Sequence, residues 1–166
     1  MTHRRRIPSV ARALVVGLLV AATVSSAAQA VPPTRTTEPP FSIDNSSLFC
    51  GFPLRVETLQ DGVTVKTFND DRQTVSGSRK LRLTNLASGE TQVLTDAGHL
   101  VTNPERTAEI FSGRTALFLF PGEPFGPGAW LFVGRTVATF AEPGGFLYSA
   151  LEVKGKRVDL CAALRD

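Results

Sequence analysis

"GRTALFLF" (residues 113–120) and "GRTVATF" (residues 134–140) are the two stretches that decide the fold class of this 166-residue chain. Both begin with Gly-Arg-Thr, both run through apolar residues to a phenylalanine, and both are followed by Glu-Pro and glycine. Glycine inside a strand pattern marks a bulge or a bend, and glycine with proline ends strands. The repeat therefore predicts two strands that kink at glycine, with a duplicated hairpin as the open alternative. The apolar run "ALFLF" is far shorter than the roughly 18 residues that span a bilayer.

Strand patterns continue on both sides of these stretches, while helical periodicity is almost absent. In "KLRLTNL" (residues 80–86) Leu81 and Leu83 share one face, and "ASGE" then turns the chain into "TQVLT" as a hairpin. Asp61-Gly62 predicts another hairpin turn, and Lys154-Gly155-Lys156 predicts a turn between the last two strands. Further strands are expected at residues 52–57, 63–68, 107–113, 115–120 and 129–140. The chain is predicted to be all-β, a single antiparallel β-barrel or β-sandwich of roughly eight to ten strands.

Residues 1–30 have the pattern of an export signal peptide. Three arginines precede an apolar run at residues 13–24, and "AQA" at residues 28–30 matches the small-x-small cleavage pattern. The alternative is an N-terminal membrane anchor, which the short apolar run disfavours. Removal of this leader takes four of the 18 basic residues and none of the 15 acidic ones, leaving 14 against 15 and a net charge of −1. We therefore expect no nucleic-acid binding and no stable membrane anchor after cleavage.

Residues 31–46 are rich in proline, threonine and serine, so they are predicted to be a flexible tether before an all-β domain at residues 47–166. Two cysteines bracket this domain, Cys50 at its start and Cys161 near its end. An exported chain with two cysteines is expected to pair them. The disulfide would be worth about 4–5 kcal/mol and would make the first and last strands neighbours. The alternative, two free thiols with one of them catalytic, fits poorly with the apolar setting of Cys50.

His99 is the only histidine that remains after the leader is removed. A small extracellular enzyme would have to use it with acidic partners, but no G-x-S-x-G or similar motif surrounds any serine. One histidine and two paired cysteines cannot supply a zinc site. The acidic turn "FNDDR" lacks the alternating ligands of a calcium loop. We therefore expect no catalytic residue assignable from sequence, no metal and no cofactor, and we keep His99 as a candidate ligand-binding residue.

The loop "PGEPFGPGAW" (residues 121–130) carries two aromatic residues, Phe125 and Trp130, among prolines and glycines. Aromatic side chains exposed on a loop can stack on a sugar or a peptide. Phe125 and Trp130 are therefore candidate ligand-binding residues. The alternative is that both rings fold back over one end of the core.

The segments "FCGFPLRVE", "LRLTNLASGE", "WLFVGRTV" and "VDLCAAL" together resemble a group of small secreted actinobacterial proteins of unknown function. The resemblance covers most of residues 49–164 and implies a secreted domain with the same cysteine framework, but no activity. We expect a secreted, non-enzymatic β-domain that binds a small or extended ligand or acts at the cell surface. A small enzyme using His99 and a structural or interaction domain of the cell envelope are the alternatives. The ligand or envelope partner and the oligomeric state stay open.

Overall fold

The computed structural model describes residues 32–37 and 40–165, so the predicted leader lies outside the described residues. The described residues form one antiparallel sheet of nine strands and a short 3-10 helix. Their bounds are β1 (Thr34–Thr37), β2 (Ile43–Ser46), β3 (Leu54–Asp61), β4 (Thr64–Thr67), β5 (Gln73–Asn85), β6 (Thr91–Thr102), β7 (Ala108–Leu119), β8 (Gly128–Phe140), β9 (Tyr148–Asp159) and η1 (Ala162–Leu164). The all-β prediction is confirmed, although the sheet is not closed into a barrel. No helix in the described part of the chain is long and apolar enough to cross a membrane.

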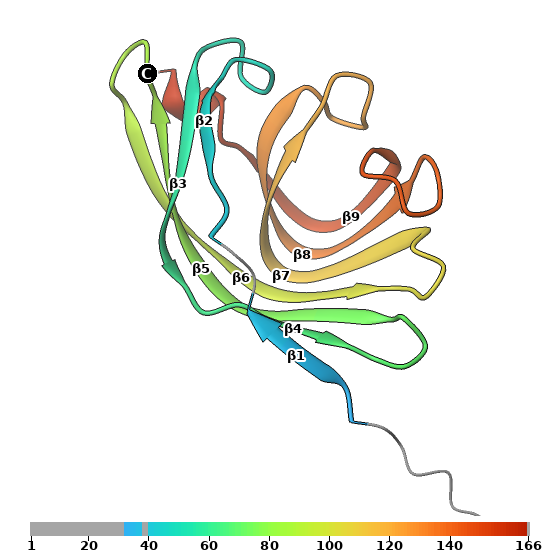
Figure 1. Cartoon of the computed structure of the whole chain (residues 1–166). Coiled ribbons are helices and arrows are strands. Elements are labelled where there is room, and N and C mark those ends of the chain that lie inside the picture. The colour runs from blue at the N-terminus through green and yellow to red at the C-terminus, as the bar shows by residue number, and fades with distance from the viewer. Residues whose placement is uncertain (1–31, 38–39, 166) are drawn as a thin grey trace, which may run out of the picture. The chain divides into compact units, whose positions relative to one another are not determined.

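The sheet is a meander from β5 to β9, with one edge built in two pieces. β3 and β4 both pair with β5, β4 along residues 73–76 and β3 along residues 79–85. β2 adds to β3 and β1 adds to β4, so they lie at the same edge of the sheet. At the other edge β9 pairs with β8 (Figure 1).

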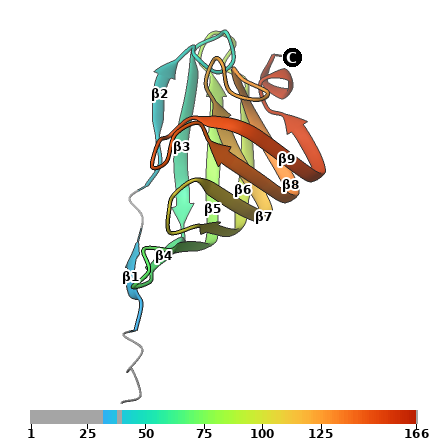
Figure 2. The same cartoon turned by 90° about the vertical axis from the view of Figure 1, so that its right-hand side faces the viewer.

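β6 and β7 are hydrogen-bonded over only part of their length. Their ladder joins residues 97–102 to residues 109–114, and beyond it the two strands separate. The sheet therefore divides into two arms (Figure 1). We call β2, β3 and residues 79–96 the first arm, and residues 115–119, 128–133 and 156–159 the second arm. Seen from the side, β8 and β9 cross in front of β3 and β5 (Figure 2).

The hydrophobic core lies between the arms. Leu54, Val56, Leu81 and Leu83 of the first arm are at most 1 % exposed. They pack in one cluster with residues of the second arm, including Ala129 and Leu131. The alternation in residues 80–86 therefore predicted the inward face of β5 correctly, because successive strand residues point to opposite sides of the sheet.

A disulfide joins Cys50 and Cys161, with a Cα–Cα distance of 5.2 Å, as predicted. Cys50 lies in the turn between β2 and β3, and Cys161 follows β9, so the bond fastens the open ends of the two arms. The Asn85 side-chain amide adds a hydrogen bond of 3.0 Å to the carbonyl of Leu164. The disulfide was expected to make the first and last strands neighbours. It brings the start of β3 and the end of β9 together, but the two strands are not paired in the sheet, since β3 pairs with β2 and β5 while β9 pairs with β8.

Five glycines lie side by side across the centre of the sheet: Gly77, Gly98, Gly113, Gly134 and Gly155 are successive partners from β5 to β9. Four of them have φ between +112° and +145°, which L side chains rarely adopt. A Cβ at any of the five would lie 2.0–2.6 Å from a backbone oxygen of a neighbouring segment, which is an adjacent strand for four of them and Gly62, between β3 and β4, for Gly77. We call this row the glycine crease. It explains the repeated glycine of the Gly-Arg-Thr stretches, because each allows its strand to bend sharply at the same level.

Two turns predicted at glycine are wrong because those glycines lie at the level of the crease. Gly155 is in the middle of β9, which is one continuous strand. Gly62 separates β3 from β4, which both pair with β5, and its amide donates a 2.9 Å hydrogen bond to the carbonyl of Ser78. Residues 107–113 and 115–120, expected as two strands, are likewise one bent strand, β7. A turn and a crease both need the unusual backbone of glycine, so local sequence does not separate them.

The segment predicted to be a tether contributes two short strands to the sheet. β1 pairs with β4 in four positions, and β2 pairs with β3 in two. These residues carry little apolar surface, but the unpaired edge of an existing sheet offers backbone partners to any extended segment. Composition alone does not reveal such a partner.

Candidate functional site

The space between the arms holds a pocket of about 370 Å³, which we call the inter-arm pocket. Its walls are mainly apolar and include Phe41, Ile43, Phe49, Leu81, Phe118 and Phe120. The pocket exists because β6 and β7 separate beyond the crease and their side chains do not fill the gap between them. Concave, mostly apolar sites of 300–1,000 Å³ are typical of small-molecule binding.

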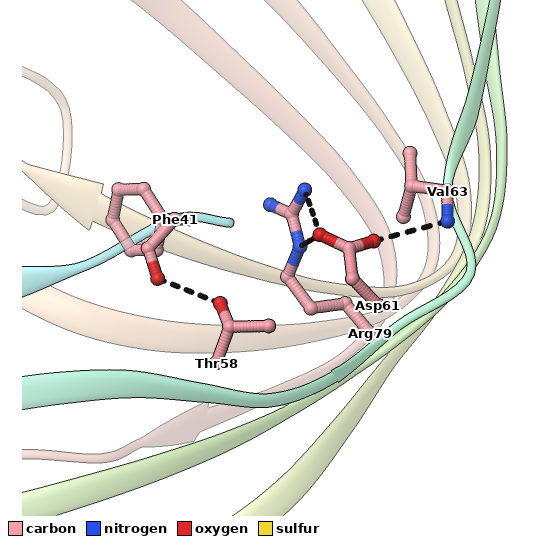
Figure 3. Close-up of polar contacts among 5 residues, drawn as sticks. All are labelled: Phe41, Thr58, Asp61, Val63 and Arg79. Atoms are coloured by element: carbon pink, nitrogen blue, oxygen red, sulfur yellow. Dashed lines mark hydrogen bonds and ion pairs between the residues drawn. The ribbon is translucent and has the colours of Figure 1, made fainter. Parts of the chain in front are cut away.

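Four phenylalanines form a continuous aromatic wall: Phe118 of the second arm, Phe120 just after β7, and Phe41 and Phe49 on either side of β2. Ring centroids lie 5.4 Å apart for Phe41 and Phe118, 5.7 Å for Phe49 and Phe118, and 5.2 Å for Phe49 and Phe120. The Thr58 hydroxyl donates a 2.6 Å hydrogen bond to the Phe41 carbonyl, which holds this segment against β3 (Figure 3). Such tilted and edge-on ring pairs each contribute about 0.5–1.5 kcal/mol beyond area burial, so the four rings stabilise one another.

Three charged residues are register partners on adjacent strands at the polar end of the pocket, and we call them the charged row. Asp61 of β3 is the register partner of Arg79 of β5, which is the register partner of Asp96 of β6. The Nε and Nη2 atoms of Arg79 each lie 3.0 Å from Oδ2 of Asp61 (Figure 3). Oδ1 of Asp61 accepts a 3.0 Å hydrogen bond from the Val63 amide. Arg79 and Asp96 both line the pocket, and the Arg79 side chain is only 12 % exposed.

A second, smaller cavity of about 170 Å³ lies against the glycine crease, and we call it the crease chamber. It shares Arg79, Asp96, Ala116 and Leu117 with the inter-arm pocket, so two members of the charged row, Arg79 and Asp96, lie where the two cavities meet. The remaining walls are more polar and include Ser76, His99 and Thr115. His99 is exposed, and its register partners on the neighbouring strands are two serines, Ser76 and Ser112.

Phe125 and Trp130 lie in a separate cluster. The Trp130 indole donates a 2.9 Å hydrogen bond to the Phe125 carbonyl, and the Phe125 ring lies 6.3 Å from Trp130 and from Phe132. The guanidinium of Arg157 covers both rings, at 4.5 Å from Phe125 and 5.5 Å from Trp130. Trp130 and Phe132 alternate along β8 with core residues, so they lie on the opposite face. The loop therefore folds back on the sheet, with Phe125 still 38 % exposed.

Sequence reasoning found one residue near the pocket system, His99, and missed the charged row and the aromatic wall. A signal for the row was present. Arg79 is separated from Leu81 and Leu83 by even numbers of residues, and Asp96 lies two positions from Leu94. Alternate residues of a strand point to the same face, so both charged residues were at inward-facing positions. The structure does not bring His99 together with Phe125 and Trp130: His99 lines the crease chamber, whereas the two aromatic residues belong to the separate cluster.

A polar network ties the β7–β8 loop to β9. The Tyr148 hydroxyl donates a 2.7 Å hydrogen bond to Oε2 of Glu109, whose Oε1 accepts from Thr102 at 3.3 Å. The buried carboxylate of Glu123 accepts hydrogen bonds from the amides of Tyr148 and Phe120. Burial, and next the negative charge of Glu109, hold the pKa of the Tyr148 phenol well above its usual value. The phenol is therefore a fixed hydrogen-bond donor at neutral pH.

This raised pKa can be checked directly because Tyr148 is the only tyrosine in the chain. We expect the folded protein to show no phenolate absorbance as pH passes about 10, where an unperturbed tyrosine titrates. The unfolded chain releases its proton there while the folded chain does not, so stability is full below about pH 10 and falls as pH rises further. Tyr148→Phe should remove the part of the loss of stability above about pH 10 that comes from this phenol. A reversible phenolate titration near pH 10 in folded protein would contradict the assignment.

Comparison with known protein families, with curated proteins and with solved structures gives no match for this chain.

Proposed function

We propose that this protein is an exported, non-enzymatic domain that binds a small, mainly apolar ligand in the inter-arm pocket. The observation that carries the proposal is the pocket of about 370 Å³ between two arms, with four phenylalanines in its wall. A well-packed core leaves few voids larger than a water molecule. An aromatic-lined space of this size is therefore better suited to a ligand than to packing alone.

Two further features support an exported binding domain. The disulfide is compatible with an extracellular protein, since such bonds persist in oxidising compartments. The pattern of residues 1–30 and the resemblance to small secreted proteins favour the same location. The proposal places the ligand in the inter-arm pocket rather than at Phe125 and Trp130, because those two rings are engaged with each other and with Arg157.

Filling the pocket tests the proposal. Ala116 lines the pocket, and Ala116→Leu adds three carbons inside it. We expect wild-type protein to bind the neutral apolar dye N-phenyl-1-naphthylamine saturably, measured by the rise in dye fluorescence. The variant should bind it at least about tenfold more weakly, because one methylene in an apolar pocket is worth about 1–3 kcal/mol.

Ala150→Leu is the matched control, since Ala150 is an exposed position of β9. It makes the same chemical change outside the pocket and should bind the dye like the wild type. Absence of saturable binding to the wild type, or equal binding by the two variants, would refute the proposed site.

A further inference from the structure

We propose further that the polar end of the ligand carries a positive charge, so that the ligand is a cationic amphiphile such as an alkylammonium compound. This inference rests on the proposed function and specifies the ligand of the same pocket. The apolar part would lie against the aromatic wall. The cationic head would lie at the charged row, where the inter-arm pocket meets the crease chamber.

The count of formal charges in the row supports this choice. The row holds two carboxylates, Asp61 and Asp96, and one guanidinium, Arg79. The net charge of the three residues is −1, and this does not depend on how the hydrogen bonds among them are distributed. Because Arg79 and Asp61 are only 12 % and 18 % exposed at their side chains, solvent screens this excess weakly. A cation restores neutrality there, whereas an anion adds to the imbalance.

Arg79 and Asp96 both line the inter-arm pocket, so a ligand there would meet both charges. Arg79 directs two of its nitrogen atoms at one oxygen of Asp61, on the β3 side. Asp96 lies on the other side of Arg79, on β6, facing the gap that separates β6 from β7. Arg79, Asp96, Ala116 and Leu117 line both cavities, so a head group that passes between them lies close to both charged side chains. The excess negative charge of the row then favours a cation over an anion at this point.

The crease chamber has suitable groups for the rest of an ammonium head. Ser76 and Thr115 line it with hydroxyl oxygens, which accept hydrogen bonds from N–H groups. The Phe111 ring also lines it, and the face of an aromatic ring attracts a cation within about 6 Å. An ammonium group would therefore meet a carboxylate, hydroxyl acceptors and a ring face in one small space.

The experiment compares three ligands with the same eight-carbon chain: octylammonium, octan-1-ol and octanoate. Each is titrated into the full, oxidised protein at neutral pH and low salt, with competition against N-phenyl-1-naphthylamine as the readout. We expect octylammonium to bind at least about tenfold more tightly than octanoate, with octan-1-ol between them. Asp96→Asn makes the row neutral and should remove most of this preference.

Asp71→Asn is the matched control. Asp71 is an exposed residue of the β4–β5 turn, so this variant makes the same change in net charge away from the pocket. It should keep the wild-type preference, which separates a local effect of Asp96 from the overall charge of the protein. Thermal unfolding shows whether Asp96→Asn is folded, and if it is not, the three-ligand comparison on the wild type decides alone.

The outcomes separate the two proposals. If the dye and all three eight-carbon ligands fail to bind, the proposed function fails and this inference fails with it. If the three ligands bind equally, or octanoate binds most tightly, the pocket is a binding site but the cationic head is refuted. Equal loss of preference in Asp96→Asn and Asp71→Asn would also overturn the role of Asp96.

Discussion

Replacing Gly134 by alanine should destabilise the protein by about 4 kcal/mol. Gly134 has a φ of +127° in the middle of β8, and a Cβ there would lie 2.4 Å from the carbonyl oxygen of Lys154. Backbone strain of this kind costs about 1–3 kcal/mol. Forcing atoms into a filled space adds about 1–3 kcal/mol. Because domains are stable by only about 5–15 kcal/mol, a large part of the stability should be lost, which urea unfolding would measure.

Gly144→Ala is the control that isolates the crowding. Gly144, in the β8–β9 loop, also has positive φ, at +71°, but a Cβ added to it would have no atom within 4 Å. Its substitution should cost only about 1–2 kcal/mol, the penalty of a left-handed backbone. If both variants unfold at the same urea concentration, close approach at the crease is not what requires glycine.

The double substitution Cys50→Ala and Cys161→Ala should lower the free energy of unfolding by about 4–5 kcal/mol. The bond closes a separation of 111 residues, and in the chain-entropy model such a loop contributes that amount. Alanine is chosen because both cysteines are at most 5 % exposed, and a serine hydroxyl would be buried there. Urea unfolding of the oxidised wild type and of the double variant gives the difference.

The same bond also holds the arms at the open end of the inter-arm pocket, where Phe49 is next to Cys50 in sequence. We therefore expect the double variant to bind N-phenyl-1-naphthylamine more weakly even where it is fully folded. Wild-type protein treated with a reducing agent provides the control, since it loses the bond without losing either sulfur. Unchanged stability in both samples would show that the arms hold together without the bond.

Local sequence predicted the parts of this fold that depend on local pattern. The alternation of Leu81 and Leu83 gave the strand and its inward face, and the "ASGE" turn gave the β5–β6 hairpin. The cysteine pairing followed from count and context. Gly62 and Gly155 were misread because a bend inside a strand and a turn between strands use the same backbone freedom. Only the pairing partners distinguish them, and those are distant in sequence.

The candidate site could not be predicted from local sequence for a different reason. The inter-arm pocket exists because β6 and β7 separate beyond residues 97 and 114, and no residue in either strand indicates that separation. Phe41 lies in a proline- and threonine-rich segment whose composition favours disorder, yet its ring packs on Phe118 of the second arm. The alternation of residues along the strands placed Arg79 and Asp96 on the inward face. This position indicates a site only once their strands are known to face a cavity.

The disulfide divides the chain into a covalent ring and two tails. Residues 50–161 form the ring, while Phe41, Ile43 and Phe49, which belong to the wall of the inter-arm pocket, lie on the N-terminal tail. A protease that cuts any loop inside the ring leaves the two pieces joined by the disulfide. A cut between Phe49 and Ile43 would instead leave the tail attached by non-covalent contacts alone. These are the β1–β4 and β2–β3 ladders, the packing of Phe41 on Phe118, the Thr58–Phe41 hydrogen bond and the Arg55–Asp44 ion pair. Loss of this tail would remove Phe41 and Ile43 from the pocket wall, while Phe118 and Phe120 would stay on the scaffold.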